Sequence, residues 1–132
     1  MKEDKINILV IEDNIDHLFF IKKALEKGNY KLTIINDGEK AYNYLLNPTQ
    51  PVDIVLLDQY LPNLQGLEIL KKLQPLKPPY RIIFMSVDNS LDTESTALKL
   101  GAIDFIAKEA SLGADLLKSI EALTQLSNHD SF

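Results

Sequence analysis

The sequence predicts a single-domain, doubly wound α/β fold in which five parallel strands alternate with five helices. Short runs rich in Ile, Leu and Val alternate with longer amphipathic runs along the whole chain, as successive βα units do. The length of 132 residues is that of one domain, and no low-complexity tract or internal repeat divides it. We therefore expect one domain over residues 5–126 and a C-terminal tail over residues 127–132.

The first predicted elements are a strand at residues 6–11, a helix at 14–28 and a strand at 31–36. The first strand is the apolar run INILVI, which is too short for a helix of ordinary length. The helix is predicted from apolar side chains that recur on one face, namely Leu18, Ile21 and Leu25. A glycine at the end of this pattern is typical of a helix C-terminus.

The middle of the chain is predicted to form a helix at 38–47, a strand at 53–57, a helix at 64–74 and a strand at 80–86. Pro48 ends the first of these helices, because proline disfavours the helical conformation in the residue before it. The strand that follows contains the run Ile-Val-Leu-Leu, the composition of a strand buried on both faces. Two consecutive prolines introduce the last strand of this group.

A polar helix at about residues 91–100, a strand at 102–107 and a long final helix complete the pattern. Ser111 is the predicted N-cap of the final helix. The apolar positions of that helix lie at near-helical spacing, namely Leu112, Leu116, Ile120 and Leu123. Crossovers between parallel strands are right-handed, so these elements predict an open sheet between two helical layers.

Composition excludes several classes of protein. The net charge is −5, the pI is about 5.0, and no run of Lys or Arg is longer than a pair, so direct nucleic-acid binding is not expected. Cysteine is absent, which removes disulfides and thiolate chemistry and suits a reducing cytoplasm. The N-terminal apolar run is too short for a signal or membrane segment, so we expect a cytoplasmic protein without membrane contact.

Polar residues follow four of the predicted strands. Glu12 and Asp13 follow the first strand, Asp58 the third, Ser86 the fourth and Lys108 the fifth. The carboxyl ends of parallel strands meet at one edge of a sheet, where ligands bind. Three carboxylates at one edge repel one another unless a cation neutralises them, and an all-oxygen set suits Mg²⁺. With a lysine and a hydroxyl beside them, they indicate phosphoryl transfer onto Asp58.

These residues lie in motifs that closely resemble the receiver domain of two-component response regulators. The motifs are VIEDN at 10–14, LLDQYLPNLQG at 56–66, IIFMS at 82–86 and GAIDFIAK at 101–108. The four motifs occur in order, and the resemblance covers residues from about 5 to about 126. It implies the flavodoxin-like, CheY-like sheet order 2-1-3-4-5.

The resemblance also implies a role for each residue of the set. Asp58 would be the phosphoacceptor, Asp13 a direct ligand of Mg²⁺, and Glu12 a ligand through water. The backbone carbonyl of Tyr60 would be a further metal ligand. No other cofactor is implied.

Three further residues are implicated by the same resemblance. Ser86 would be the hydroxyl that turns toward the phosphoryl group, Lys108 the ammonium that pairs with its oxygens, and Phe105 the aromatic switch. Phe105 lacks the hydroxyl of the tyrosine that is commoner in the family. Glu109 replaces a frequent proline, so the Lys108–Glu109 peptide bond is expected to be trans.

Two expectations concern the first helix. His17 is expected to be an exposed residue of its first turn. Phe19 and Phe20 are expected to belong to a wide buried stripe, with a partner-docking role as the alternative.

The leading hypothesis is a signalling switch that accepts a phosphoryl group from a histidine kinase or phosphotransfer protein and then changes its binding to an unknown output protein. It would not be a classical enzyme, but a phosphoacceptor that assists its own phosphorylation and dephosphorylation. We expect a monomer or a phosphorylation-dependent dimer. The chain would be either a single-domain regulator or a piece of a longer protein.

Two other classes remain as alternatives, a small phosphohydrolase with an aspartyl-phosphate intermediate and a phosphorylation-independent adaptor. Tyr60 stands where one phosphatase family requires a second aspartate. A flavin carrier would need a phosphate loop after the first strand, whereas the sequence there is EDNID, which repels phosphate.

Overall fold

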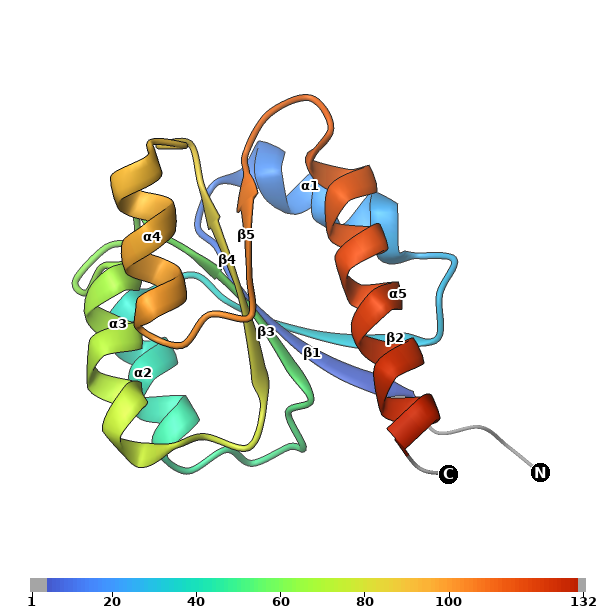
Figure 1. The fold of residues 1–132 in the computed structure, drawn as a ribbon, viewed down its shortest axis with the longest axis horizontal. Coiled ribbons are helices and arrows are strands. Elements are labelled where there is room, and N and C mark those ends of the chain that lie inside the picture. The colour runs from blue at the N-terminus through green and yellow to red at the C-terminus, as the bar shows by residue number, and fades with distance from the viewer. Residues whose placement is uncertain (1–4, 131–132) are drawn as a thin grey trace.

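The computed structural model describes residues 5–130, with side chains described as far as residue 125. A five-stranded parallel sheet lies between two layers of helices (Figure 1). The strands are β1 Ile6–Ile11, β2 Tyr30–Ile35, β3 Ile54–Asp58, β4 Arg81–Ser86 and β5 Asp104–Ala107. The helices are α1 Ile15–Leu25, α2 Gly38–Leu46, α3 Gly66–Leu73, the 3₁₀ turn η1 Gln74–Leu76, α4 Leu91–Lys99 and α5 Leu112–Asp130.

The sheet has the order β2-β1-β3-β4-β5, and every paired neighbour is parallel, which confirms the predicted fold class and strand order. The connection from β2 to β3 passes across β1, so β1 and β3 each have a neighbouring strand on both sides. All five residues of β3 are buried, as its run of branched aliphatic side chains predicts. The strands end together at one edge, which is the upper edge in Figure 1.

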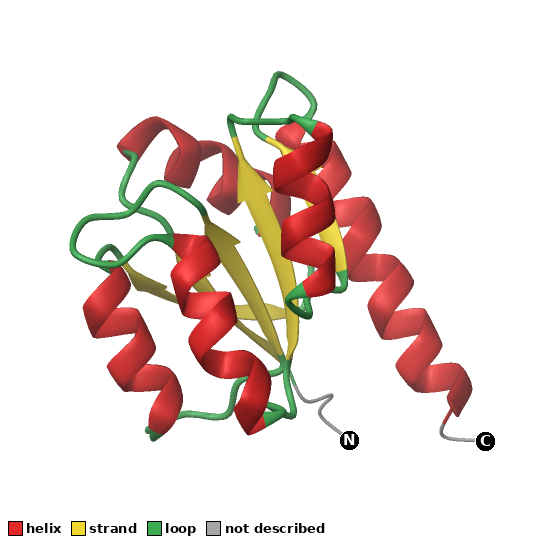
Figure 2. Cartoon of the chain, turned by 60° about the vertical axis from the view of Figure 1, so that its left-hand side comes forward, coloured by secondary structure: helices red, strands yellow, loops and turns green. Residues whose placement is uncertain are grey.

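Two apolar cores fill the spaces on either side of the sheet, because successive strand side chains point to opposite faces. On one face α1 and α5 pack over strand residues such as Val10, Leu56 and Met85. On the other face α2, α3 and α4 pack over residues such as Ile11 and Leu57 (Figure 2). Each fully buried side chain of this size contributes roughly 1.5–3 kcal/mol of transfer free energy, so the strand ends are rigidly placed.

The predicted elements are all present, with ends that differ by up to about three residues, as helix and strand termini usually do. The turn η1 was not predicted. Helix α5 begins at Leu112, directly after the predicted N-cap, and continues to Asp130, into the segment predicted as a tail. Residues 121–130 contain no proline or glycine that would end the helix earlier.

The expected wide buried stripe on α1 is wrong. Phe19 and Phe20 are 60% and 54% exposed, and their rings contact each other edge to face with centroids 5.7 Å apart. Only Ile21 and Leu25 of this helix are fully buried. The helix lies close to α5, since a Cβ built at Gly113 would lie 3.1 Å from the Cβ of Ala24. Phe19 and Phe20 are turned away from the buried Ile21 by about 200° and about 100° around the helix axis.

The peptide bond between Lys108 and Glu109 is trans, as predicted, since the described residues contain no cis peptide bond. Among those same residues, no helix combines the length and apolar character that crossing a membrane requires.

Candidate functional site

The fold brings the predicted polar residues to one edge of the sheet. Asp58 is the last residue of β3 and lies opposite Met85 of β4. Ser86 ends β4 and lies opposite Ala107, one residue before Lys108. Glu12 follows β1 directly, and its backbone N–H donates to the carbonyl of Ile35. Backbone pairing therefore sets the relative positions of four strand ends before any side chain is considered.

The ammonium of Lys108 lies between two buried carboxylates. Its Nζ is 2.7 Å from Glu12 Oε1 and 2.9 Å from Asp58 Oδ1, and all three side chains are at most 4% exposed. At these distances the single ammonium forms an ion pair with both carboxylates. One cation between two buried anions leaves this pair of carboxylates short of positive charge.

The electrostatics of Asp58 reflect that shortage. The pKa of the Asp58 carboxyl is raised to about 7, first by burial and then by the negative charge of Glu12. The positive charge of Lys108 acts in the opposite direction. Additional positive charge nearby would therefore stabilise the ionised form of Asp58.

The carboxylates of Glu12, Asp13 and Asp58 offer ligand atoms that all lie within 4.8 Å of one another. Glu12 and Asp58 are buried, whereas Asp13 is exposed and opens the cluster toward solvent. The donor set consists of oxygen atoms alone, which fits a hard cation such as Mg²⁺. The two buried carboxylates of Glu12 and Asp58 share one ammonium, which is a second reason for a cation here. These three residues could therefore hold a metal ion.

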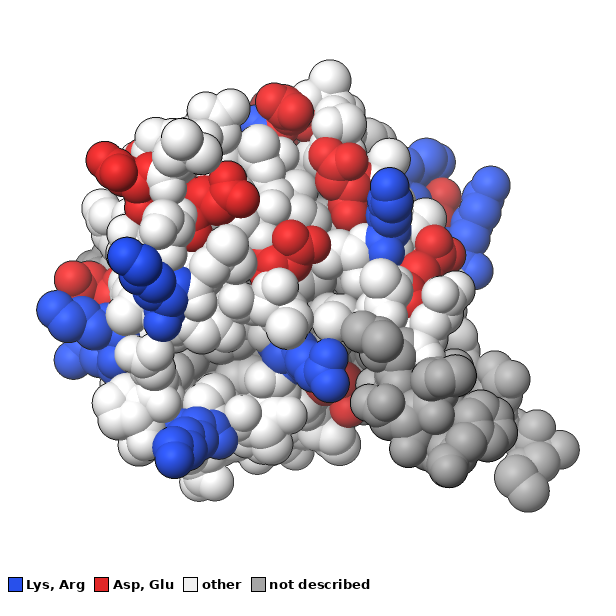
Figure 3. Space-filling view, viewed as in Figure 1, with Lys and Arg blue, Asp and Glu red and all other residues white. Residues whose placement is uncertain are grey.

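Acidic side chains gather toward the upper part of the face drawn in Figure 3, near the edge where β4 and β5 end. Lys and Arg side chains lie mainly along the left and right sides and in the lower part of that view. A local excess of negative charge raises the concentration of cations around the site.

Ser86 and Phe105 lie near the acidic cluster but have other partners. Ser86 is fully buried, and its Oγ accepts a hydrogen bond of 3.0 Å from the backbone N–H of Asp88. The half-buried ring of Phe105 stacks on Phe84, with centroids 6.1 Å apart. In this arrangement Phe105 belongs to the core beneath α4, and Ser86 is tied to the β4–α4 loop.

Tyr60 follows Asp58 by two residues, and its side chain is 47% exposed at the start of the β3–α3 loop. The loop is anchored by Gln59, whose importance the sequence analysis missed. Its backbone carbonyl accepts from Gly66 N–H at 2.8 Å, and its side-chain Oε1 accepts from Leu67 N–H at 2.8 Å. Gly66 is required for this fit, because a Cβ there would come within 2.3 Å of the Asp58 carbonyl oxygen. A lone glutamine after a strand carries no sequence signal for such an anchor.

His17 is not the exposed residue that the sequence predicted. Its side chain is 26% exposed, and Nδ1 is buried 3.8 Å from Glu12 Oε2 without a hydrogen-bond partner. The first turn of α1 places it there, because Asn14 caps the helix by accepting from the His17 N–H. The Asn14 N–H in turn donates to Glu12 Oε2 at 3.1 Å, so the cap also fixes the acidic side chain.

Comparison with known proteins places this site in a family. The family model described as the response regulator receiver domain matches residues 8–121, which include every residue of the site. The chain belongs to the response regulator receiver domain family. The receiver domain is a component of two-component signalling, and this one carries the acidic cluster, the lysine and the hydroxyl at the ends of its strands.

One curated relative is the transcriptional regulatory protein ZraR of Escherichia coli strain K12, which is 32% identical over 108 residues. The aligned region is 82% of this chain and 24% of that protein, so the chain spans about a quarter of its length.

Two solved structures show the same fold. The CheY-like receiver domain protein of Methanospirillum hungatei JF-1 superposes with a TM-score of 0.82 at 25% identity, over 96% of this chain and 99% of that one. The phosphorylated cyanobacterial phytochrome response regulator RcpA has a TM-score of 0.78 at 25% identity, over 89% and 91% of the two chains.

We expect Mg²⁺ to stabilise the receiver domain through the acidic cluster. A ligand present at about 100 times its Kd stabilises the folded state by about 2.7 kcal/mol, which raises the Tm of a domain of this size by roughly 10 °C. Asp13→Asn removes one carboxylate of the cluster and should abolish most of the Mg²⁺-dependent rise in thermal melts. Asp16→Asn is the control, because it makes the same change three residues after Asp13, at an exposed position of α1 that is not part of the cluster. An equal Mg²⁺ effect in both variants would contradict the site.

Proposed function

We propose that this receiver domain accepts a phosphoryl group on Asp58 from the phosphohistidine of a histidine kinase or phosphotransfer protein. The observation that carries the proposal is the buried Asp58 carboxylate, held 2.9 Å from the Lys108 ammonium and beside two further carboxylates. The fold relative solved in a phosphorylated form supports it by analogy.

The proposed reaction is a simple exchange of bonds at phosphorus. An Asp58 carboxylate oxygen forms a new P–O bond while the P–N bond to the donor histidine breaks. The leaving imidazole nitrogen keeps the electron pair of the broken bond and takes up a proton. Lys108 already lies against Asp58 and can pair with the phosphoryl oxygens. Mg²⁺ held by Glu12, Asp13, Asp58 and the Tyr60 carbonyl would supply positive charge for the carboxylates and the phosphoryl group.

Signalling requires that the phosphoryl group favour one conformation of the domain over another. The groups able to do this are Ser86 and Lys108, which end neighbouring strands and can contact the new oxygens. The backbone N–H of Lys108 donates to the Ser86 carbonyl at 2.9 Å, so a shift of either residue displaces the other. Phe105, three residues before Lys108 on β5, would then reposition its ring and change the surface near α4.

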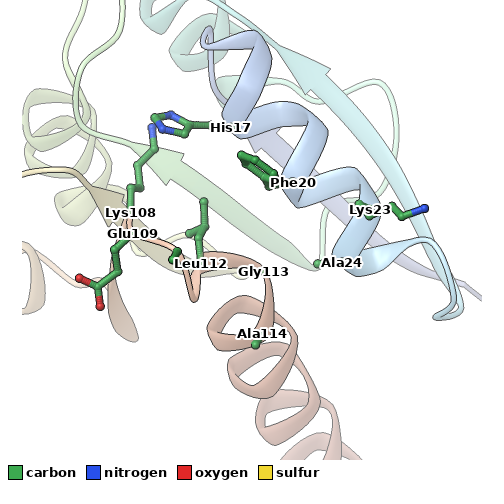
Figure 4. A pocket seen from close by; sticks show the side chains of 10 residues that line it. His17, Phe20, Lys23, Ala24, Lys108, Glu109, Leu112, Gly113 and Ala114 are labelled. Carbon is green, nitrogen blue, oxygen red and sulfur yellow. The ribbon is translucent and has the colours of Figure 1, made fainter.

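A groove beside the site offers a place for the phosphodonor protein. It has a volume of about 600 Å³ and lies between α1 and the segment that leads from β5 into α5 (Figure 4). His17 and Lys108 line its end near the acidic cluster, and Phe20 and Leu112 line its apolar part. The exposed ring of Phe20 extends this apolar surface to solvent. A helix that carries a phosphohistidine could bury its apolar face here and bring the phosphoryl group to Asp58.

Phosphorylation should occur on Asp58 and nowhere else. Incubation with acetyl phosphate and Mg²⁺ is expected to add one phosphoryl group per chain, because a buried carboxylate beside a cation site needs little else to act as acceptor. Intact-mass spectrometry measures the product. Asp58→Asn should lose the modification, and Asp16→Asn should keep it. Modification of Asp58→Asn at the rate of the parent chain would refute the assignment.

Phosphotransfer from a protein donor should depend on Phe20 more than on Phe19. Both rings are exposed, but only Phe20 lines the groove, so Phe19→Ala is a matched control for Phe20→Ala. We expect Phe20→Ala to slow transfer from a cognate phosphorylated donor by about tenfold, which is the effect of one interface anchor. Donors are found by profiling the histidine kinases of the source organism, and transfer is followed with radiolabelled phosphate. Equal rates for the two variants would place the docking surface elsewhere.

A further inference from the structure

The hydroxyl of Ser86 is held by a chain of hydrogen bonds that runs into the first turn of α4. Its Oγ accepts from the backbone N–H of Asp88 at 3.0 Å. The Asp88 carboxylate accepts from the Ser90 N–H at 3.0 Å and from the Thr93 hydroxyl at 2.7 Å. We call these four residues, Ser86, Asp88, Ser90 and Thr93, the Asp88 clasp.

The far end of the Asp88 clasp is part of the helix itself. Ser90 is the N-cap of α4, and its Oγ accepts from the Thr93 N–H at 3.2 Å. The Ser90 and Thr93 hydroxyls are 3.1 Å apart, which closes a ring of contacts around the Asp88 carboxylate. The hydrogen bond from Thr93, followed by those from Ser90, lowers the pKa of Asp88, so its carboxylate is held in the ionised form. Hydrogen bonds to an ionised acceptor are stronger than those between neutral groups.

The Asp88 clasp opposes a change of position at Ser86. A serine side chain moves between staggered positions, and a rotation toward Asp58 takes Oγ out of line with the Asp88 N–H. The Asp88 backbone cannot follow the hydroxyl, because its own carboxylate is anchored to two groups of α4. The Asp88 N–H then loses the acceptor that the Ser86 hydroxyl provides. Either the hydrogen bond from Asp88 is lost, or the start of α4 moves with it.

We propose that the Asp88 clasp is a positioning device. It holds Ser86 in its resting arrangement and couples rotation of the Ser86 hydroxyl to movement of the start of α4. This inference rests on the proposed function, in which Ser86 turns toward a phosphoryl group on Asp58. Asp88 and Thr93 act through Ser86 and touch no reacting atom. The strength of the Asp88 clasp sets the fraction of chains in the arrangement that accepts the phosphoryl group, and apparent affinity scales with that fraction.

The test measures the apparent affinity for beryllium fluoride, a phosphoryl mimic, in the presence of Mg²⁺. Binding is followed by the NMR signals of the backbone amides of Asp88 and Thr93. Thr93→Val keeps the side-chain shape and removes the hydroxyl that donates to Asp88. We expect it to tighten apparent binding by about tenfold. Thr96→Val is the matched control, because it makes the same substitution one turn further along α4 at an exposed position, and its affinity should equal that of the parent.

A double-mutant cycle separates this role from a general effect on the helix. In a Ser86→Ala background Thr93→Val should no longer change the affinity, because the hydroxyl through which the clasp acts is gone. Asp88→Asn is a second way to weaken the clasp and should tighten binding in the parent background, so the test does not depend on one variant folding. Thermal melts check that each variant is folded.

Four outcomes are decisive. Affinities of Thr93→Val and Asp88→Asn that match or fall below that of the parent would overturn the Asp88 clasp, as would an increase that persists in the Ser86→Ala background. Failure of the parent chain to bind beryllium fluoride, or binding that survives Asp58→Asn, would overturn the proposed function and with it the inference. The first two results leave phosphorylation of Asp58 standing, so the two failures are distinguishable.

Discussion

The ion pairs that Lys108 makes with Glu12 and Asp58 are the interaction on which the site depends. A buried carboxylate at a strand end is costly unless a cation lies against it, and here two such carboxylates share one ammonium. Their proximity is imposed by the pairing of β1 with β3 and by the crossover that returns β5 beside β4. The two apolar cores stabilise that arrangement. Folding therefore assembles an excess of negative charge that a bound cation is suited to relieve.

The surroundings of Asp58 connect this imbalance to the surface. On one side, Gln59 ties the residue after Asp58 to the first turn of α3, where only glycine fits at position 66. On another side, the Asp88 clasp joins Ser86 to the first turn of α4. On a third side, Lys108 lines the groove against α1. Short chains of contacts thus connect the surroundings of Asp58 to the first turns of α3 and α4 and to the groove beside α1. Under the proposed function, these are the routes by which a phosphoryl group on Asp58 would alter the surface.

Much of the fold and the composition of the site could be predicted from the sequence, because apolar runs that stop on Asp58, Ser86 and Lys108 mark the carboxyl edge of a parallel sheet. The remaining features depend on side-chain packing that carries no periodic signal. The exposure of Phe19 and Phe20 follows from the choice of Ile21 and Leu25 as the buried side of α1. His17 is partly buried beside Glu12, in the turn that the Asn14 cap begins. Likewise, nothing in the sequence indicates that the Asp88 carboxylate will accept hydrogen bonds from Ser90 and Thr93.

The central claim is that Asp58 lies in a buried site that is short of positive charge before any cation or phosphoryl group binds. The most direct measurement is the pKa of the Asp58 carboxyl in metal-free protein, read from its side-chain ¹³C NMR shift as the pH is varied. Burial and the charge of Glu12 predict a midpoint of about 7. A midpoint near the ordinary aspartate value of about 4 would contradict the account, because it would show that Lys108 alone already balances the site.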